Sequence, residues 1–126
     1  MKKILLVEDN PMNADMLSRR LRRRGFLVVT AVDGLSAVAC AASERPDVIL
    51  MDMSLPEIDG FEATRRLKAS PATSPIPVIA LTAHALVSDR DRAFLAGCDK
   101  FETKPVDFDR LLQTIEALVG AHAAHR

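Results

Sequence analysis

The sequence predicts an α/β domain in which helices cover both faces of a parallel five-stranded sheet. Short apolar runs alternate with amphipathic segments along the chain, giving five strand–helix pairs. Most of these apolar runs are continuous and do not alternate with polar residues, as expected for strands buried on both faces. Strands that alternate with helices are typical of a doubly wound parallel sheet with right-handed crossovers.

The composition is that of one globular domain. The 126 residues are 48% hydrophobic, which suffices for a single core at this length. The 17 basic and 17 acidic side chains balance, so net charge supports neither a nucleic-acid partner nor a membrane surface. No apolar stretch is long enough to span a bilayer, and Cys40 and Cys98 form no CxxC motif. A reduced, cytoplasmic protein is therefore expected.

The first half of the chain contains three predicted strands and two helices. Residues 4–7 form the first strand, and the next helix is expected to have Asn10 as its N-cap and Pro11 at its first position. Gly25 is expected to end this helix, because glycine readily adopts the left-handed conformation found there. The next strand, helix and strand are predicted at 27–30, 34–44 and 48–51.

The second half is predicted to contain two strands and three helices. A turn-rich loop at 55–60 leads into the first of these helices, and the last strand is polar, which places it at a sheet edge. The elements before the final helix are predicted at 61–69, 78–81, 86–96 and 99–102. Helical spacing is clearest for the final helix, in Phe108, Leu111, Leu112, Ile115, Leu118 and Val119. The domain is expected to cover 1–121, with a short tail at 122–126.

Polar side chains follow four of the predicted strands at the point where each strand ends. In an open α/β sheet, ligands bind at the carboxyl ends of the strands, near the point where the strand order reverses. These ends carry three carboxylates, a hydroxyl and an ammonium group, from Glu8, Asp9, Asp52, Thr82 and Lys104. Three close carboxylates repel one another unless a cation intervenes. Since hard divalent ions prefer oxygen ligands, a magnesium site is expected here.

The same side chains suit phosphoryl transfer. Mg²⁺ usually keeps several waters, one of which a phosphoryl oxygen can replace. A lysine neutralises the charge on phosphoryl oxygens, and a threonine hydroxyl donates a hydrogen bond to them. A carboxylate can itself be the nucleophile and accept the phosphoryl group. The strand ends therefore indicate a carboxylate that is phosphorylated in the presence of Mg²⁺.

Four short motifs resemble the receiver domain of two-component response regulators. They are VEDN at 7–10, LMDMSLPEIDG at 50–60, ALTA at 80–83 and TKP at 103–105. One such motif alone is weak, but four in the family's order, spread over the whole chain, are specific. The resemblance implies the flavodoxin-like (βα)₅ fold with strand order 2-1-3-4-5. Within the family, the chain resembles the stand-alone, single-domain type (CheY-like and DivK-like receivers).

The resemblance implies the metal site and the acceptor. Asp52 is the expected phosphoacceptor, and Asp9 and Asp52 are expected to bind Mg²⁺ directly. Glu8 is expected to act mainly through water, and Ser54 to contribute its backbone carbonyl to the metal. Mg²⁺ is the expected ion, with Mn²⁺ as an alternative. The chain is then a signalling domain that promotes only its own phosphorylation and dephosphorylation, and not an enzyme.

The resemblance also implies the phosphoryl contacts and the switch. Thr82 and Lys104 are expected to hold the phosphoryl oxygens, and the Lys104–Pro105 bond is expected to be cis. Thr82 and Phe101 are the expected switch residues. Phe101 has no phenolic hydroxyl to pair with Thr82, unlike the tyrosine that can occupy this position.

The implied partners are proteins. A sensor histidine kinase or histidine phosphotransfer protein would donate the phosphoryl group, and a downstream protein would read the switch. In the family, the first helix and the loop after Lys104 meet the donor. Met12 and Met16 project away from the apolar stripe of that helix, so they and Pro105 are expected docking residues. The arginines at 19, 20, 22, 23 and 24 are expected to form a solvated face. Some of them are expected to contact the donor protein as well.

The sequence argues against three other functions. A haloacid-dehalogenase-type phosphatase needs a second Asp two residues after the nucleophile, where this chain has Ser54. A nucleotide-binding module needs clustered glycines, whereas the five glycines here are scattered. A pseudo-receiver would bind partners without being phosphorylated. The complete set of acidic residues, with Thr82 and Lys104, argues against this alternative.

Overall fold

The computed structural model describes residues 1–83 and 86–123 and confirms the predicted α/β architecture. One parallel sheet has the strand order β2-β1-β3-β4-β5. The strands are β1 (Lys3–Val7), β2 (Leu27–Ala31), β3 (Val48–Asp52), β4 (Val78–Thr82) and β5 (Lys100–Thr103). The helices are α1 (Pro11–Arg23), α2 (Gly34–Glu44), α3 (Gly60–Ala69), α4 (Val87–Ala96) and α5 (Phe108–Ala123).

The helix boundaries follow the local signals in the sequence. Asn10 is the N-cap of α1, and its side chain accepts a hydrogen bond from the Asn13 backbone N–H at 3.0 Å. Gly25 follows this helix with φ of 92°, which a residue with a Cβ rarely adopts. The α5 helix reaches Ala123, beyond the apolar residues whose spacing predicts it, and alanine favours helix. Of the tail expected at 122–126, residues 124–126 lie outside the described residues.

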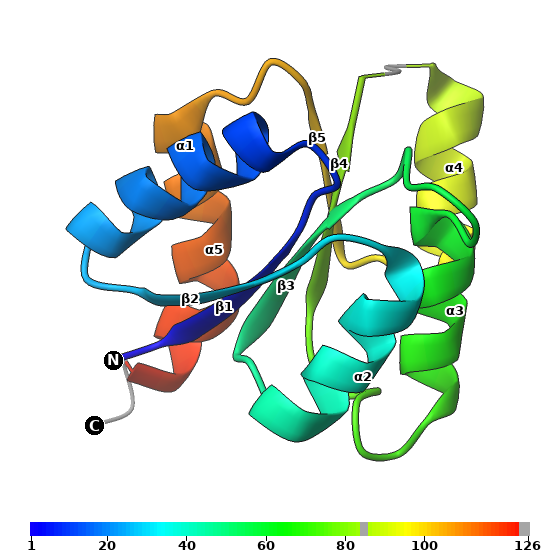
Figure 1. The fold of residues 1–126 in the computed structure, drawn as a ribbon, viewed down its shortest axis with the longest axis horizontal. Helices are drawn as coiled ribbons and strands as arrows, with labels where there is room; N and C mark the ends of the chain where they lie inside the picture. The colour runs from blue at the N-terminus through cyan, green and yellow to red at the C-terminus, as the bar shows by residue number, and fades with distance from the viewer. Residues whose placement is uncertain (84–85, 124–126) are drawn as a thin grey trace.

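Alternate residues of the strands build two cores, one on each face of the sheet. Ile4 and Leu6 of β1 pack with side chains of α1 and α5, including Leu21 and Ile115. Leu5 and Val7 pack on the opposite face, against residues of α2, α3 and α4. Figure 1 shows α1 and α5 on one side of the sheet and the other three helices on the far side. Helices thus cover both faces of the three central strands, β1, β3 and β4, which explains the continuous apolar runs of these strands.

The edges of the sheet also follow the prediction. β5 lies at one edge, as its polarity indicated, and β2 lies at the other. Cys98 is buried, whereas Cys40 is only half-buried beside the core. Within 1–83 and 86–123, no helix combines the length and apolar character that a membrane crossing requires.

The register of the strands brings the polar strand ends to one level. Val7 is paired with Met51, so the residue after β1 lies beside the last residue of β3. Asp52 is paired with Leu81, and Thr82 with Thr103. The residues that follow β1, β3, β4 and β5 therefore meet at the same edge, where the strand order reverses between β1 and β3.

Core packing on the sheet predicts the effect of a cavity. Leu50 is fully buried in β3, so Leu50→Ala should lower the free energy of unfolding by about 2–5 kcal/mol. Leu95 on α4 is 88% exposed and is the matched control, for which Leu95→Ala should change stability by less than about 0.5 kcal/mol. Urea unfolding followed by circular dichroism measures both. Equal losses in the two variants would contradict the placement of the core.

Candidate functional site

Three carboxylates meet at the carboxyl ends of β1 and β3. Glu8, Asp9 and Asp52 each offer one oxygen, and these oxygens lie within 4.8 Å of one another. Glu8 and Asp52 are buried, whereas Asp9 is exposed. A set of three carboxylate oxygens with one open side fits Mg²⁺, which prefers oxygen ligands and retains waters. The sequence prediction that these three residues come together is confirmed.

Lys104 lies between two of the carboxylates. Its Nζ atom is 3.0 Å from Glu8 Oε1 and 3.2 Å from Asp52 Oδ2. Its backbone N–H donates to the Thr82 carbonyl at 2.7 Å, which holds the loop after β5 against the end of β4. The Lys104–Pro105 peptide bond is cis, as expected. The lysine expected to contact phosphoryl oxygens therefore already lies at the Asp52 carboxylate.

Backbone N–H groups hold the other carboxylate oxygens. The Ser54 N–H donates to Asp52 Oδ1 at 2.9 Å, and the Asn10 N–H donates to Glu8 Oε2 at 3.1 Å. Asp52 and Glu8 are thus each oriented by one amide and one ammonium group. Both amides belong to the loops after β1 and β3, so the loop conformations decide the direction of the two side chains.

Burial and the shared lysine determine the electrostatics. Burial, together with the charge of Asp52, raises the pKa of Glu8 above its ordinary 4.5 in spite of the lowering by the Asn10 N–H and by Lys104. Burial alone would lower the pKa of Lys104, but the hydrogen bonds to Glu8 and Asp52 and the charges of both carboxylates together outweigh burial and raise that pKa. Lys104 is therefore a permanent cation at neutral pH.

Thr82 ends β4 and is buried, with 3% of its surface exposed. It lies one residue beyond Leu81, the partner of Asp52 in the neighbouring strand. Its own partner in register is Thr103, the residue before Lys104. Thr82 is thus located between the strand of Asp52 and the strand that precedes Lys104. Its contact with a phosphoryl group stays a prediction.

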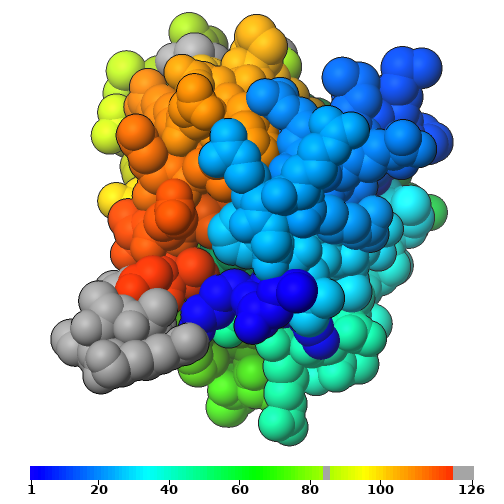
Figure 2. All heavy atoms as spheres, turned by 90° about the vertical axis from the view of Figure 1, so that its left-hand side faces the viewer, coloured from blue at the N-terminus to red at the C-terminus, as the bar shows by residue number. Residues whose placement is uncertain are grey.

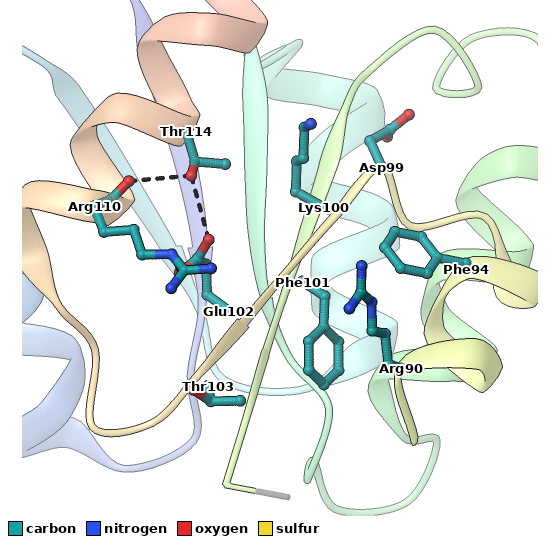
Figure 3. Close-up of a pocket in the computed structure, with 9 residues that line it drawn as sticks. All are labelled: Arg90, Phe94, Asp99, Lys100, Phe101, Glu102, Thr103, Arg110 and Thr114. Carbon is teal, nitrogen blue, oxygen red and sulfur yellow. Dashed lines mark hydrogen bonds and ion pairs between the residues drawn. The ribbon is translucent and has the colours of Figure 1, made fainter. Parts of the chain in front are cut away.

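Phe101 is half-buried on β5, where a cavity of about 490 Å³ lies between α4 and α5. Figure 3 shows its ring near Phe94 and Arg90 of α4. On the other side of β5, Glu102 pairs with Arg110 at 3.3 Å and accepts a hydrogen bond from Thr114 at 3.3 Å. The expected switch residue therefore has open space beside it, into which its ring could turn.

Two of the three expected docking residues line a second hollow. Met16, Pro105 and Lys104 line a groove of about 550 Å³ beside the acidic residues. Figure 2 shows α1 and the segment after β5 side by side on this face. Met12 is 71% exposed on the first turn of α1 but does not line the groove. Met16 and Pro105 thus share one surface with the site, and Met12 lies on the same helix.

The arginines of α1 are exposed, but the expectation of a simple solvated face is only partly confirmed. The Cζ atom of Arg20 lies 4.1 Å from the centre of the Phe108 ring, and that of Arg24 lies 5.6 Å from it. Arg22 donates to the Val28 carbonyl at 3.1 Å. These side chains pack α1 onto α5 and β2. No pattern in the sequence indicated this, because Phe108 is far from α1 along the chain.

Comparison with known proteins agrees with this arrangement. The profile of the response regulator receiver domain matches residues 4–116. The chain belongs to the response regulator receiver domain family. It is thus a receiver of two-component signalling with the flavodoxin-like receiver fold.

Two curated relatives illustrate the family. The polar-differentiation response regulator DivK of Brucella anthropi is 37% identical to this receiver over 119 residues, covering 94% of this chain and 97% of DivK. The DNA-binding dual master transcriptional regulator RpaA of Synechocystis is 38% identical over 119 residues and also covers 94% of this chain. The receiver spans only 49% of the length of RpaA, so RpaA is similar to it over about half of its own chain.

Two solved structures match the fold of this receiver. The receiver domain of the sensor histidine kinase PA1611 from Pseudomonas aeruginosa has a TM-score of 0.88 and 40% identity, covering 94% of this chain and 98% of that one. That structure has a magnesium ion coordinated in its active site cleft. The chemotaxis protein CheY4 of Vibrio cholerae has a TM-score of 0.88 and 30% identity, covering 94% and 98%. Family membership removes the phosphatase and nucleotide-binding alternatives.

The raised pKa of Glu8 predicts a pH-dependent stability. Between pH 4.5 and the raised pKa, the folded state binds more protons than the unfolded state. The contribution of Glu8 to stability is therefore greatest below pH 4.5 and decreases as the pH rises through that interval. We expect Glu8→Gln to lack this decrease and to be at least as stable as the wild type near pH 7 without Mg²⁺.

Urea unfolding of both proteins across this pH range tests the prediction. Mg²⁺ should stabilise the wild type more than Glu8→Gln, because the variant has lost one carboxylate. Glu116→Gln, on the exposed surface of α5, is the control and should follow the wild-type pH profile. A Glu8→Gln protein less stable than the wild type at every pH would show that the Glu8–Lys104 ion pair outweighs the cost of burial.

Proposed function

We propose that Asp52 accepts a phosphoryl group from a phosphohistidine, with Mg²⁺ bound at Asp9, Asp52 and the Ser54 carbonyl. Glu8 would contact the ion mainly through water. The observation that supports this most is the convergence of Glu8, Asp9 and Asp52 within 4.8 Å, with Lys104 Nζ 3.2 Å from the Asp52 carboxylate. These groups offer a nucleophile, oxygen ligands and a cation at one point. Mn²⁺ would also suit this set of ligands.

The chain's residues have defined tasks in the transfer. A carboxylate oxygen of Asp52 forms a bond to phosphorus while the bond from phosphorus to the histidine nitrogen breaks, and the nitrogen takes that electron pair. The Ser54 N–H keeps the carboxylate oriented during the attack. When bound, Mg²⁺ would offset the negative charge between carboxylate and phosphoryl group. Lys104 then moves from the carboxylates to a phosphoryl oxygen, and the Thr82 hydroxyl donates to another.

The same movement would carry the signal to the surface. Lys104 and Phe101 both belong to the β5 region, and Thr82 ends the neighbouring strand. Movement of Thr82 and Lys104 toward the phosphoryl group would change the packing of Phe101 beside its cavity. The surface between α4 and α5 would change as a result. A downstream protein would read that surface. The product is the phosphorylated receiver, so the domain, which we place at 1–121, turns over no external substrate.

The donor would be a sensor histidine kinase or a histidine phosphotransfer protein. The groove lined by Met16 and Pro105 lies beside Glu8 and Lys104, so a donor that occupied it would present its histidine to the acidic residues. Exposed methionines adapt to partner surfaces. Because the phosphohistidine of such donors is cytoplasmic, we propose the cytoplasm as the site of action.

Phosphorylation with a small donor tests the acceptor. After incubation with acetyl phosphate and Mg²⁺, the intact mass of the wild type should increase by one phosphoryl group. Asp52→Asn should gain none, because its amide is not a nucleophile toward phosphorus. Chelation of Mg²⁺ should abolish the gain.

A short-lived adduct would escape this assay, so beryllofluoride binding is measured in parallel. Beryllofluoride forms a stable phosphoryl-like complex with carboxylates and should bind the wild type but not Asp52→Asn. If the wild type neither gained mass nor bound beryllofluoride, the chain would be a pseudo-receiver that acts by partner binding alone.

Donor docking is tested by the double variant Met12→Ala/Met16→Ala. Loss of two exposed apolar contacts should slow transfer from a cognate phosphohistidine protein about thirtyfold, at roughly 1 kcal/mol for each side chain. Phosphorylation by acetyl phosphate should stay unchanged, because no docking is involved. Leu27→Ala, a half-exposed residue at the opposite end of the sheet, is the control. Equal transfer rates in the double variant and the wild type would show that these methionines do not contribute to docking of the donor.

A further inference from the structure

Arg92, on α4, contacts the start of α3 in two ways. Its Nη2 atom lies 3.4 Å from Asp59 Oδ2, and its Cζ atom lies 4.0 Å from the centre of the Phe61 ring. Phe61 is 7% exposed whereas Arg92 is exposed, so the guanidinium group covers the ring at the surface. The sequence did not indicate either contact, because α3 and α4 are separated by β4. Arg92 thus joins α4 to the residues that begin α3.

Asp59 has a second partner that determines where α3 begins. Its Oδ1 atom accepts a hydrogen bond from the Glu62 backbone N–H at 2.9 Å, as the N-cap of the helix. One carboxylate therefore caps α3 with one oxygen and faces Arg92 with the other. A shift of α4 that displaced Arg92 would act on the first turn of α3.

Gly60 connects that turn to the backbone of the acceptor. Its N–H donates to the Met53 carbonyl at 3.2 Å. A Cβ atom added to Gly60 would lie 2.5 Å from the Asp52 carbonyl oxygen and 2.7 Å from Met53 Cα. Because the two backbones are in direct contact, the first residue of α3 cannot approach β3 more closely, and their positions are coupled.

The loop between β3 and α3 depends on contacts from both of its neighbours. Glu57 in this loop has φ of 63°, a left-handed conformation that residues with a Cβ rarely adopt. On the α2 side, a Cβ added to Gly34 would lie 2.6 Å from Ile58 Cγ1, so helix and loop are tightly packed. On the α4 side, Arg92 faces Asp59. The loop is thus strained and is held in place from two helices.

We propose that Arg92 is a positioning residue that couples α4 to the binding of Mg²⁺ and a phosphoryl group at Asp52. This inference rests on the proposed function, in which the Ser54 carbonyl binds the metal. By facing Asp59, Arg92 keeps the loop that carries Ser54 in its binding conformation. Because coupling between sites is reciprocal, occupation of the metal and phosphoryl site strengthens the Arg92–Asp59 contact and restrains α4.

Arg90 offers a matched control on the same helix. It is an exposed arginine, and its Cζ atom lies 5.7 Å from the centre of the Phe94 ring, another residue of α4. Its ring contact therefore stays within α4 and does not reach the loop after β3. A general effect of removing a positive charge from α4 should appear equally in Arg90→Ala and Arg92→Ala.

The first test measures binding. The chain contains neither Trp nor Tyr, so Mg²⁺ affinity is measured by isothermal titration calorimetry and beryllofluoride affinity by fluorine NMR. Arg92→Ala should weaken both about two- to fivefold, the effect expected for one exposed cation–π contact. Arg92→Lys keeps a charge facing Asp59 and should recover part of the affinity. Arg90→Ala should bind as the wild type does.

A double-mutant cycle separates coupling from a simple loss of stability. Asp59→Asn keeps a side-chain oxygen for the helix cap and removes the charge that faces Arg92. The effects of Arg92→Ala and Asp59→Asn on thermal unfolding should be non-additive, and the non-additivity should increase when Mg²⁺ and beryllofluoride are bound. The measurement without ligands requires no phosphoryl chemistry, so it tests the contact independently of the proposed function.

The outcomes are distinguishable. If the wild type binds both ligands and Arg92→Ala binds them equally well, Arg92 has no positioning role. An additive cycle, with or without ligands, would also overturn the inference. A wild type that bound neither ligand would refute the proposed function, and the inference with it, even if the ligand-free cycle were non-additive. Should Arg92→Ala fail to fold, Arg92→Lys takes its place in both measurements and should show a smaller loss.

Discussion

Two buried carboxylates share one ammonium group, and the rest of the site depends on that contact. Lys104 reaches Glu8 and Asp52 from 96 and 52 residues farther along the chain. Two negative charges buried without a cation would be costly, so strand order, register and the turn after β5 must together deliver the lysine. A metal ion added to this site would enter a cluster already partly neutralised. The fold can therefore form before the metal binds.

Lys104 and the Asn10 N–H do not fully offset the cost of burying the Glu8 carboxylate. Burial raises the pKa of Glu8 in spite of its two hydrogen bonds, which means that the folded protein resists its ionised form. The acidic cluster is carried on the ends of strands that are themselves covered on both faces by apolar side chains. A rigid sheet thus holds groups that repel one another, and a divalent cation bound there would relieve that repulsion.

The helices around the site make different contacts with it. α1 carries the residues that we assign to the donor, and α5 packs against it through Phe108. On the opposite face, α4 lies between the cavity beside Phe101 and the loop that follows Asp52. A helix that contacts both the proposed output surface and the loop after the proposed acceptor would respond to changes in either. The contacts of Arg92 and the open space near Phe101 are therefore two parts of the same region.

The sequence by itself determined the five strands, the five helices, the N-cap at Asn10 and the polar residues at the strand ends, because periodicity and capping are local signals. Strand order came from the resemblance to a family, since alternation alone leaves the order open. Only the tertiary structure decided that Lys104 lies between Glu8 and Asp52, that Arg20 covers Phe108 and that Arg92 faces Asp59. These contacts join residues that are distant along the chain, and no local pattern encodes which charged side chain will find which partner once the helices pack.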